Sequence, residues 1–401
     1  MKSAFVRNAT VLGMLSAIGP FAIDMYLPAF PVIARELHAD VGAVQMSLTS
    51  FFLAVAICQL VYGPVSDRVG RKPPLYFGLI LFIFGGIGCS FAQDASTLIA
   101  FRFLQGVGAC STMVITRAVI RDLHTGAEAA RLIATSMLVL SVSPILAPLA
   151  GSTLTEFFSW RIIFWAIVGI GLIGLVIVAS LLPETRKAGT VTGGVGHVLR
   201  TYRDLFKDWH FLGLVFMGGL GQASFFAYLA GSSVVFIEHF GLSPSRYSLI
   251  FAANAIAFIG GAQFNSFLMR RFGAERVVRA ALSVFAILTT LLCVLTLGGI
   301  DNAYVLWGLL FAAFGSLGLV IPSTAVLALE SHGPVAGTAS ALMGTLQLGT
   351  GATAIVLVSA FFDGTSRSMV TAIAVCGLTA FTLSRTVLKP RAFPSTTASS
   401  Q

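Results

Sequence analysis

Two charged side chains lie inside long apolar runs of this sequence and could carry out proton chemistry. Asp24 lies in the run 10–31, and Arg102 lies in the run 97–119. On membrane-insertion scales, an ionised side chain at the middle of a helix costs about 2.5 to 3.5 kcal/mol. Each of these residues therefore needs a partner, a water-filled cavity or a changed protonation state.

We expect Asp24 and Arg102 at a similar depth. If the chain starts on the cytoplasmic side, Asp24 lies roughly 20 Å along the first run and Arg102 lies roughly 8 Å along the other, so both fall in the outer half of the membrane. Burial favours a neutral carboxyl and a nearby guanidinium favours a carboxylate, so Asp24 could exchange a proton when its distance from Arg102 changes. The alternative is a static ion pair that fixes helix register, but a permanent buried pair is a poor source of stability.

The composition requires a membrane protein. Of the 401 residues, 56% are hydrophobic and only 10% are charged, whereas about a quarter of the residues in soluble domains carry charge. A span needs about 20 apolar residues, so we expect an all-α protein with twelve transmembrane helices. The first run is too long for a signal peptide core and should remain as a span. The expected spans are 10–31, 45–65, 74–93, 97–119, 132–155, 161–182, 210–236, 247–269, 277–299, 303–327, 336–360 and 368–388.

The cations are arranged as a membrane topology requires. With a cytoplasmic N-terminus, the 25 Lys and Arg residues fall at the inner side, except Arg35, Arg102, Arg161, Arg246 and Arg367. This is the positive-inside pattern, with both termini cytoplasmic. The net charge of +9 is then a consequence of topology, and we expect no nucleic-acid partner.

The longest connection divides the chain into two sets of six spans. We expect an N-terminal half at 1–182, a cytoplasmic linker at 183–209, and a C-terminal half with a short tail at 210–401. The linker contains either a short amphipathic helix on the membrane surface or a plain solvated tether. A weak repeat of 67–71 at 270–276 predicts two pseudo-symmetric halves around a central cavity.

The loop after the second span is short and strongly charged. It contains Gly63, Asp67, Arg68, Gly70 and Arg71. Gly70 permits a tight turn, and Asp67 can meet a basic side chain or a helix N-terminus. We therefore expect a contact here that latches one conformation of the two halves.

Prolines interrupt two of the expected spans. Pro20 lies four residues before Asp24 and should bend that helix so that the carboxyl faces the cavity. Pro144 and Pro148 lie one turn apart in the fifth span, followed by Gly151. This pattern is typical of a helix that flexes or packs closely through small residues. A simple packing kink is the alternative.

The other candidate cavity residues are neutral. An apolar, aromatic cavity with a few amides suits uncharged or weakly amphipathic molecules of drug size. Each residue could instead serve helix packing, because the 33 Phe residues of the chain cannot all face a cavity. Besides Asp24, the candidates are Phe21, Tyr26, Gln105, Gln222, Phe225, Tyr228, Asn254 and Gln347.

Several other functions are excluded by missing patterns. The sequence has no Gly-Lys dipeptide and therefore no phosphate-binding loop of an ATP-driven pump. The six His residues fall at loops or span ends, so we expect no metal site, no cofactor and no enzyme activity. No ring of charges or repeated filter segment indicates a channel.

Several motifs resemble those of the major facilitator superfamily. Residues 63–75 resemble its loop signature, residues 98–110 resemble its fourth-span motif, and the proline-rich fifth span is similar to the antiporter motif of 12-span drug exporters. More narrowly, residues 23–29 (IDMYLPA), 117–122 (RAVIRD) and 159–165 (SWRIIFW) resemble the bicyclomycin and chloramphenicol resistance branch, Bcr/CflA.

This resemblance implies a proton/drug antiporter of the bacterial cytoplasmic membrane that works by alternating access. Asp24 would be the proton-responsive acid and Arg102 its electrostatic partner. No second acid precedes Asp24 in the first span, which argues against a strong preference for cationic drugs. We expect a monomer whose partners are a small molecule, protons and the lipid bilayer. The alternative within transporters is a proton-linked carrier of a metabolite such as a nucleoside or sugar.

Overall fold

The computed structural model describes residues 2–123, 126–186 and 195–388, and these residues form helices and no strands. The helices are α1 (Lys2–Asp24), α2 (Phe30–Glu36), α3 (Val41–Val69), α4 (Lys72–Ser90), α5 (Ala95–Leu123), α6 (Gly126–Phe157), α7 (Arg161–Ser180), α8 (Val195–Leu205), α9 (Trp209–Val234), α10 (Pro244–Phe272), α11 (Ala274–Leu297), α12 (Ala303–Glu330), α13 (Ala336–Ala360) and α14 (Arg367–Val387). Three short elements, η1 (Leu27–Ala29), η2 (Val235–His239) and η3 (Gly333–Val335), lie between them.

Most of these helices are built to cross a membrane. Within the described residues, 11 helical segments are long and apolar enough to span it, beginning with 7–36. A further helix of 32 residues, α6, packs against α1 and α10. The expectation of an all-α membrane protein is confirmed. Several helices are longer than the apolar runs, because polar residues at their ends are helical too.

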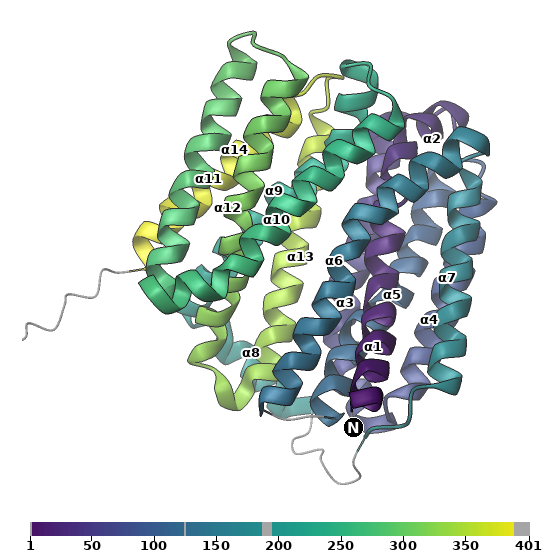
Figure 1. Ribbon diagram of the computed structural model, residues 1–401, viewed down its shortest axis with the longest axis vertical. Coiled ribbons are helices and arrows are strands. Elements are labelled where there is room, and N and C mark those ends of the chain that lie inside the picture. The colour runs from purple at the N-terminus through teal and green to yellow at the C-terminus, as the bar shows by residue number, and fades with distance from the viewer. Residues whose placement is uncertain (1, 124–125, 187–194, 389–401) are drawn as a thin grey trace, which may run out of the picture.

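The helices pack as two groups. Helices α1 and α3 to α7 contact one another, and so do α9 to α14. Figure 1 shows the first group in purple and blue beside the second group in green and yellow. Contacts between the groups run mainly through α3 with α13 and through α6 with α10.

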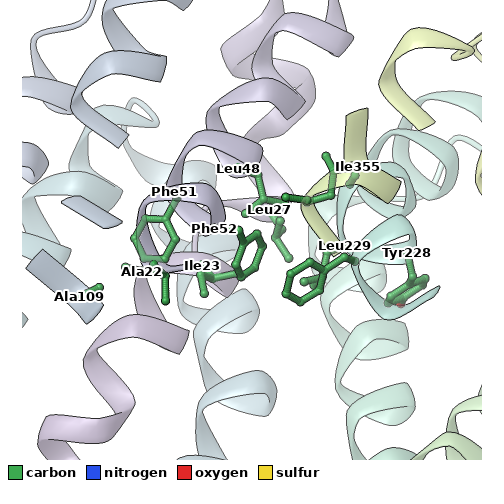
Figure 2. Close-up of a cluster of buried hydrophobic side chains, with 14 of the residues drawn as sticks. Ala22, Ile23, Leu27, Leu48, Phe51, Phe52, Ala109, Tyr228, Leu229 and Ile355 are labelled. Carbon is green, nitrogen blue, oxygen red and sulfur yellow. The ribbon is translucent and has the colours of Figure 1, made fainter. Parts of the chain in front are cut away.

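Side chains from both groups form one hydrophobic cluster at this junction. Figure 2 shows Ile23, Leu27 and Phe52 of the first group facing Leu229 and Ile355 of the second. The ring of Phe52 also stacks on that of Phe226, with centroids 3.9 Å apart. Aromatic contacts of this kind add about 0.5 to 1.5 kcal/mol beyond area burial, so this stack stabilises the contact between the two groups.

Besides a 2.9 Å hydrogen bond from Thr345 of α13 to the Ala56 carbonyl at the middle of α3, polar contacts between the groups gather toward one end of the bundle. We call it the Arg35 end, and we call the opposite end, where α3 passes into α4, the Arg71 end. Arg35 forms an ion pair with Glu238 at 2.9 Å. The Gln45 amide donates to the Ala230 carbonyl at 2.9 Å, and Ser245 bonds with Glu156. The two groups are therefore joined by polar bonds at the Arg35 end.

The first membrane-spanning segment is interrupted directly after Asp24. Pro20, where the sequence predicts a bend, lies inside α1. The helix ends at Asp24 and is followed by a turn at Met25 and Tyr26 and then by η1. Pro28 lies in η1. Because proline lacks an N–H and disfavours helical geometry in the residue before it, the interruption falls here.

Helix α6 covers this interruption. A Cβ added to Gly151 would lie 1.7 Å from the Met25 carbonyl oxygen, so only a glycine allows this approach. One turn earlier, the Pro148 carbonyl accepts a hydrogen bond from Ser248 of α10 at 3.0 Å. Residues of the proline-rich segment thus join α1 to α10.

We predict that Gly151→Ala destabilises the protein by about 1 to 3 kcal/mol, because the added methyl group forces the backbone of α1 and α6 apart. Gly169→Ala in α7 is the matched control, since a Cβ there meets nothing within 4 Å. Thermal unfolding in detergent should show a midpoint several degrees lower for Gly151→Ala only. Equal midpoints for the two variants would contradict this close contact.

Candidate functional site

Asp24 lies at the end of α1, with 6% of its surface exposed. Within the part of the chain that is described, its carboxyl forms no hydrogen bond or ion pair. It interacts electrostatically with Tyr247 of α10. The η1 segment that follows contacts α6, α9 and α10. The carboxyl is therefore buried at the junction of the two groups.

Arg102 of α5 is fully buried and does not pair directly with Asp24. Its guanidinium lies over the rings of Tyr26 and Phe51, 4.4 and 4.5 Å from their centroids. Its Nη1 donates to the Ala22 carbonyl at 3.1 Å and to the Gln105 side chain at 2.5 Å. Two aromatic faces and two neutral oxygens thus hold the charge, and Arg102 meets α1 through a backbone carbonyl two residues before Asp24.

Arg102 and Gln105 each retain hydrogen-bond donors that have no acceptor among the described residues. Arg102 Nε, Arg102 Nη2 and Gln105 Nε2 are buried and have no hydrogen-bond partner among the described residues. Tyr26, by contrast, uses its hydroxyl in a 2.9 Å bond with Ser47. Four residues that the sequence singled out, Asp24, Arg102, Tyr26 and Gln105, therefore come together around the end of α1.

The second group contributes an aromatic cluster. Tyr228 of α9 accepts a 3.0 Å hydrogen bond from Asn254 of α10, and its ring lies 5.0 Å from that of Phe314. Phe225 lies 5.7 Å from Phe314, and Phe251 stacks on Tyr228 at 5.7 Å. Asn254 Oδ1 is buried without a partner in the described residues. The structure thus brings the predicted residues Phe225, Tyr228 and Asn254 together.

Tyr247 of α10 lies beside this cluster and within electrostatic range of Asp24, and no sequence pattern singled it out. Its hydroxyl bonds with Ser232 at 3.0 Å, and its ring lies 6.1 Å from that of Phe251. Neutral aromatic residues occur in most of the spans, so Phe251, Phe314 and Tyr247 could be recognised only from their packing.

Three other predicted cavity residues lie apart from this cluster. Phe21 lines a groove of about 570 Å³ between α1 and α6. Gln222 is half-buried on α9. Gln347 of α13 is buried against Gly218, where an added Cβ would lie 2.7 Å from its amide nitrogen. No group of three His, Cys, Asp or Glu residues in the described ranges could hold a metal ion.

The charged loop at the Arg71 end forms a compact network. Arg71 bonds with Asp67 at 2.5 Å, with Asp122 at 2.7 Å and with Ser66 at 2.8 Å. These partners lie on α3 and α5, so the network is internal to the first group. Two other predicted latch residues are peripheral: Arg68 is exposed, and a Cβ on Gly63 would meet nothing within 4 Å.

Glu184, just after α7, fixes the start of α4. Its carboxylate accepts backbone N–H bonds from Arg71 at 2.9 Å and from Lys72 at 3.0 Å. Gly70, with φ of 100°, makes the turn between the helices and is close enough that a Cβ would lie 2.9 Å from Glu184. Burial raises the pKa of Glu184, but the backbone N–H donors outweigh it and hold this pKa below its usual range. Glu184 was not among the predicted site residues. Its position, an acid directly after the span 161–182 on the side of the basic loops, could have indicated a role there.

Comparisons with known proteins agree with this architecture. A family model described as Major Facilitator Superfamily matches residues 12–355. The chain is 36% identical to an uncharacterized MFS-type transporter, YdgK, of Bacillus subtilis, over 85% of each chain. It is 31% identical to a bicyclomycin resistance protein homolog of Haemophilus influenzae, over 94% of each.

A solved structure has the same fold. The crystal structure of the nucleoside transporter NupG superposes with a TM-score of 0.74, covering 96% of this chain and 98% of that one, at 11% sequence identity. At so low an identity the likeness concerns the fold alone.

We predict that Glu184→Ala lowers stability by about 1 kcal/mol at neutral pH, the usual effect of losing a helix cap. Because the folded state lowers the pKa of Glu184, its stabilisation is present above the ordinary value of 4.5 and is lost as the pH falls through the folded pKa. The difference in unfolding midpoint between wild type and variant should therefore shrink below about pH 4.5. Glu330→Ala, at an exposed acid, is the control, and the same pH trend in that variant would contradict the assignment.

Proposed function

The chain belongs to the Major Facilitator Superfamily, and we propose that it is a proton-coupled secondary transporter that exports drug-like small molecules in exchange for protons. The relative named for bicyclomycin resistance, similar over nearly its whole length, supports a drug-like substrate. We place the protein in the bacterial cytoplasmic membrane, as a monomer with both termini inside.

The observation that carries this proposal is the position of Asp24. A carboxylate buried without a partner costs several kcal/mol, so such a group is held as the neutral acid until water or a cation reaches it. Asp24 lies where the first span is interrupted and where both groups of helices meet. Movement of the groups would change its surroundings, and the proton would then be taken up on one side and released on the other.

The proposed transport cycle uses two halves of six spans, 1–182 and 210–401, joined by the linker 183–209, with α6 as the twelfth span. In this arrangement the halves are bonded at the Arg35 end, which the positive-inside pattern makes the outer end. Arg35 and Glu238 are 65% and 35% exposed, and pairs of this kind are worth only about 0 to 1 kcal/mol. Such a contact can close the outer face and still open in each cycle.

The substrate we propose is neutral or weakly amphipathic. Aromatic rings meet at the junction between the halves, where Phe52 stacks on Phe226. Within the second half, Asn254 and Gln347 each retain an unsatisfied amide atom. Aromatic faces and amides bind uncharged polar molecules without fixing one scaffold. A single proton entering down 100 mV supplies about 2.3 kcal/mol, and each pH unit adds about 1.4, so one proton can hold a solute gradient of roughly tenfold to several hundredfold.

We predict that Asp24→Asn abolishes proton-driven transport, because the amide cannot exchange a proton, while the protein still inserts and folds. Drug efflux should be measured in vesicles with an imposed pH gradient, with unfolding midpoints as the control for folding. Wild-type efflux in this variant would exclude the proposed proton site, and concentrative uptake of a metabolite by the wild type would favour the carrier function instead.

We predict that Arg102→Gln shifts the pH dependence of substrate binding, since it removes the charge closest to the end of α1. Arg102→Lys retains that charge and should preserve more of the wild-type profile. Binding measured from pH 5 to pH 9 distinguishes the two. Unchanged pH profiles in both variants would leave Arg102 with a packing role only.

A further inference from the structure

A surface groove runs between α11 and α14, at the edge of the second group far from α1 (Figure 1). Its volume is about 430 Å³. Six of the eight side chains that line it are apolar, the exceptions being Ser283 and Thr290. Ile287, Leu291 and Val294 along α11 are 66%, 44% and 62% exposed. Leu378 and Phe381 of α14 form its other wall. These α11 residues are exposed in the described part of the chain, on a helix that is apolar enough to span a membrane, so we take the groove to face the lipid.

The length of the groove matches one leaflet of a bilayer. Ser283 and Val294 mark its two ends on α11, and this separation corresponds to roughly 16 Å along a helix. The hydrocarbon core of a bilayer is about 30 Å thick, so one leaflet contributes about 15 Å. The end at Ser283 is the one nearer the Arg71 end of the bundle, where α11 begins.

Cations lie at that end of the groove. The guanidinium of Arg385 lies over the ring of Phe381, 6.0 Å from its centroid. Arg279, one turn before Ser283, donates to the Leu388 carbonyl at 3.1 Å, and its Nε is buried without a partner among the described residues. Beyond Glu275 in the first turn of α11, neither helix contains an acidic residue. The groove therefore combines an apolar channel with a positively charged mouth.

The other groove, between α1 and α6, lacks this combination. It is lined by Phe21, Leu149, Thr153 and neighbouring residues, and the charged residue next along α6 is the acid Glu156. An anionic head group would be repelled there. Charge thus distinguishes the α11–α14 groove from a general lipid-facing surface.

We propose that the α11–α14 groove is a binding site for an anionic phospholipid, with an acyl chain in the groove and its phosphate between Arg279 and Arg385. The exposed apolar wall recognises the chain, and the two guanidinium groups recognise the phosphate, for which arginine geometry is well suited. This site is independent of the proposed proton site at Asp24, so each can fail without the other.

The test uses the full-length protein purified in detergent, with phosphatidylglycerol as the probe and phosphatidylcholine as the competitor. Native mass spectrometry counts bound lipids and gives their dissociation constants. We expect wild type to bind phosphatidylglycerol in preference to phosphatidylcholine. Removing both cations in Arg279→Gln/Arg385→Gln should weaken binding roughly 30-fold. Each cation near a lipid phosphate strengthens binding about fivefold, and the two factors multiply.

Two further variants keep the test decisive if the double variant folds poorly. Ile287→Trp fills the exposed channel and should reduce phosphatidylglycerol binding with both cations intact. Arg367→Gln removes an exposed cation from the opposite end of α14 and should bind like wild type. Equal binding of the two lipids, wild-type affinity in both Ile287→Trp and the double variant, or a dimer whose interface is this groove would each overturn the proposal.

Discussion

The structure depends on covering a break in the backbone at membrane depth. Helix α1 ends at Asp24, and the turn that follows leaves carbonyl and N–H groups outside regular helix bonds. Because a bilayer interior offers no water, such a segment is tolerated only where protein surrounds it or a cavity is wet. Gly151 meets this need by letting α6 approach the Met25 carbonyl directly, while η1 is covered by α9 and α10. The break therefore draws both groups of helices to the one acid buried in the described spans.

The same scarcity of water explains how Arg102 is held. A guanidinium cannot lose its proton, so its burial must be compensated by rings, carbonyls or an acid. Here the rings of Tyr26 and Phe51 and the Ala22 carbonyl compensate it. A permanent bond to Asp24 would fix that carboxyl as an anion. Without it, Asp24 keeps the ability to be neutral, which the proposed proton exchange requires.

Sequence patterns predicted the parts of this arrangement that depend on composition. Scarce charges identified Asp24 and Arg102, and long apolar runs identified the helices. The partners were beyond such reasoning. That Arg102 bonds to the Ala22 carbonyl depends on rotamers and on how α1 lies against α5. That Tyr247 lies within electrostatic range of Asp24 depends on how the two groups meet. The break after Asp24 was not predicted either, because a break at membrane depth is tolerated only where another helix such as α6 covers it, and this packing cannot be inferred from one span at a time.

Arg102 and Asp24 are linked through one short stretch of backbone, and this gives their coupling a direction. Arg102 bonds to the last regular turn of α1, and Asp24 is the residue at which that turn ends. Any motion of α6 or α10 that displaces the Met25 carbonyl must act on this turn, because Gly151 leaves no space for a side chain between them. In the proposed cycle, rocking of the halves therefore reaches the carboxyl and the guanidinium together. The separation between the carboxyl and the guanidinium then changes through the backbone, without an ion pair between Asp24 and Arg102 that would have to break first.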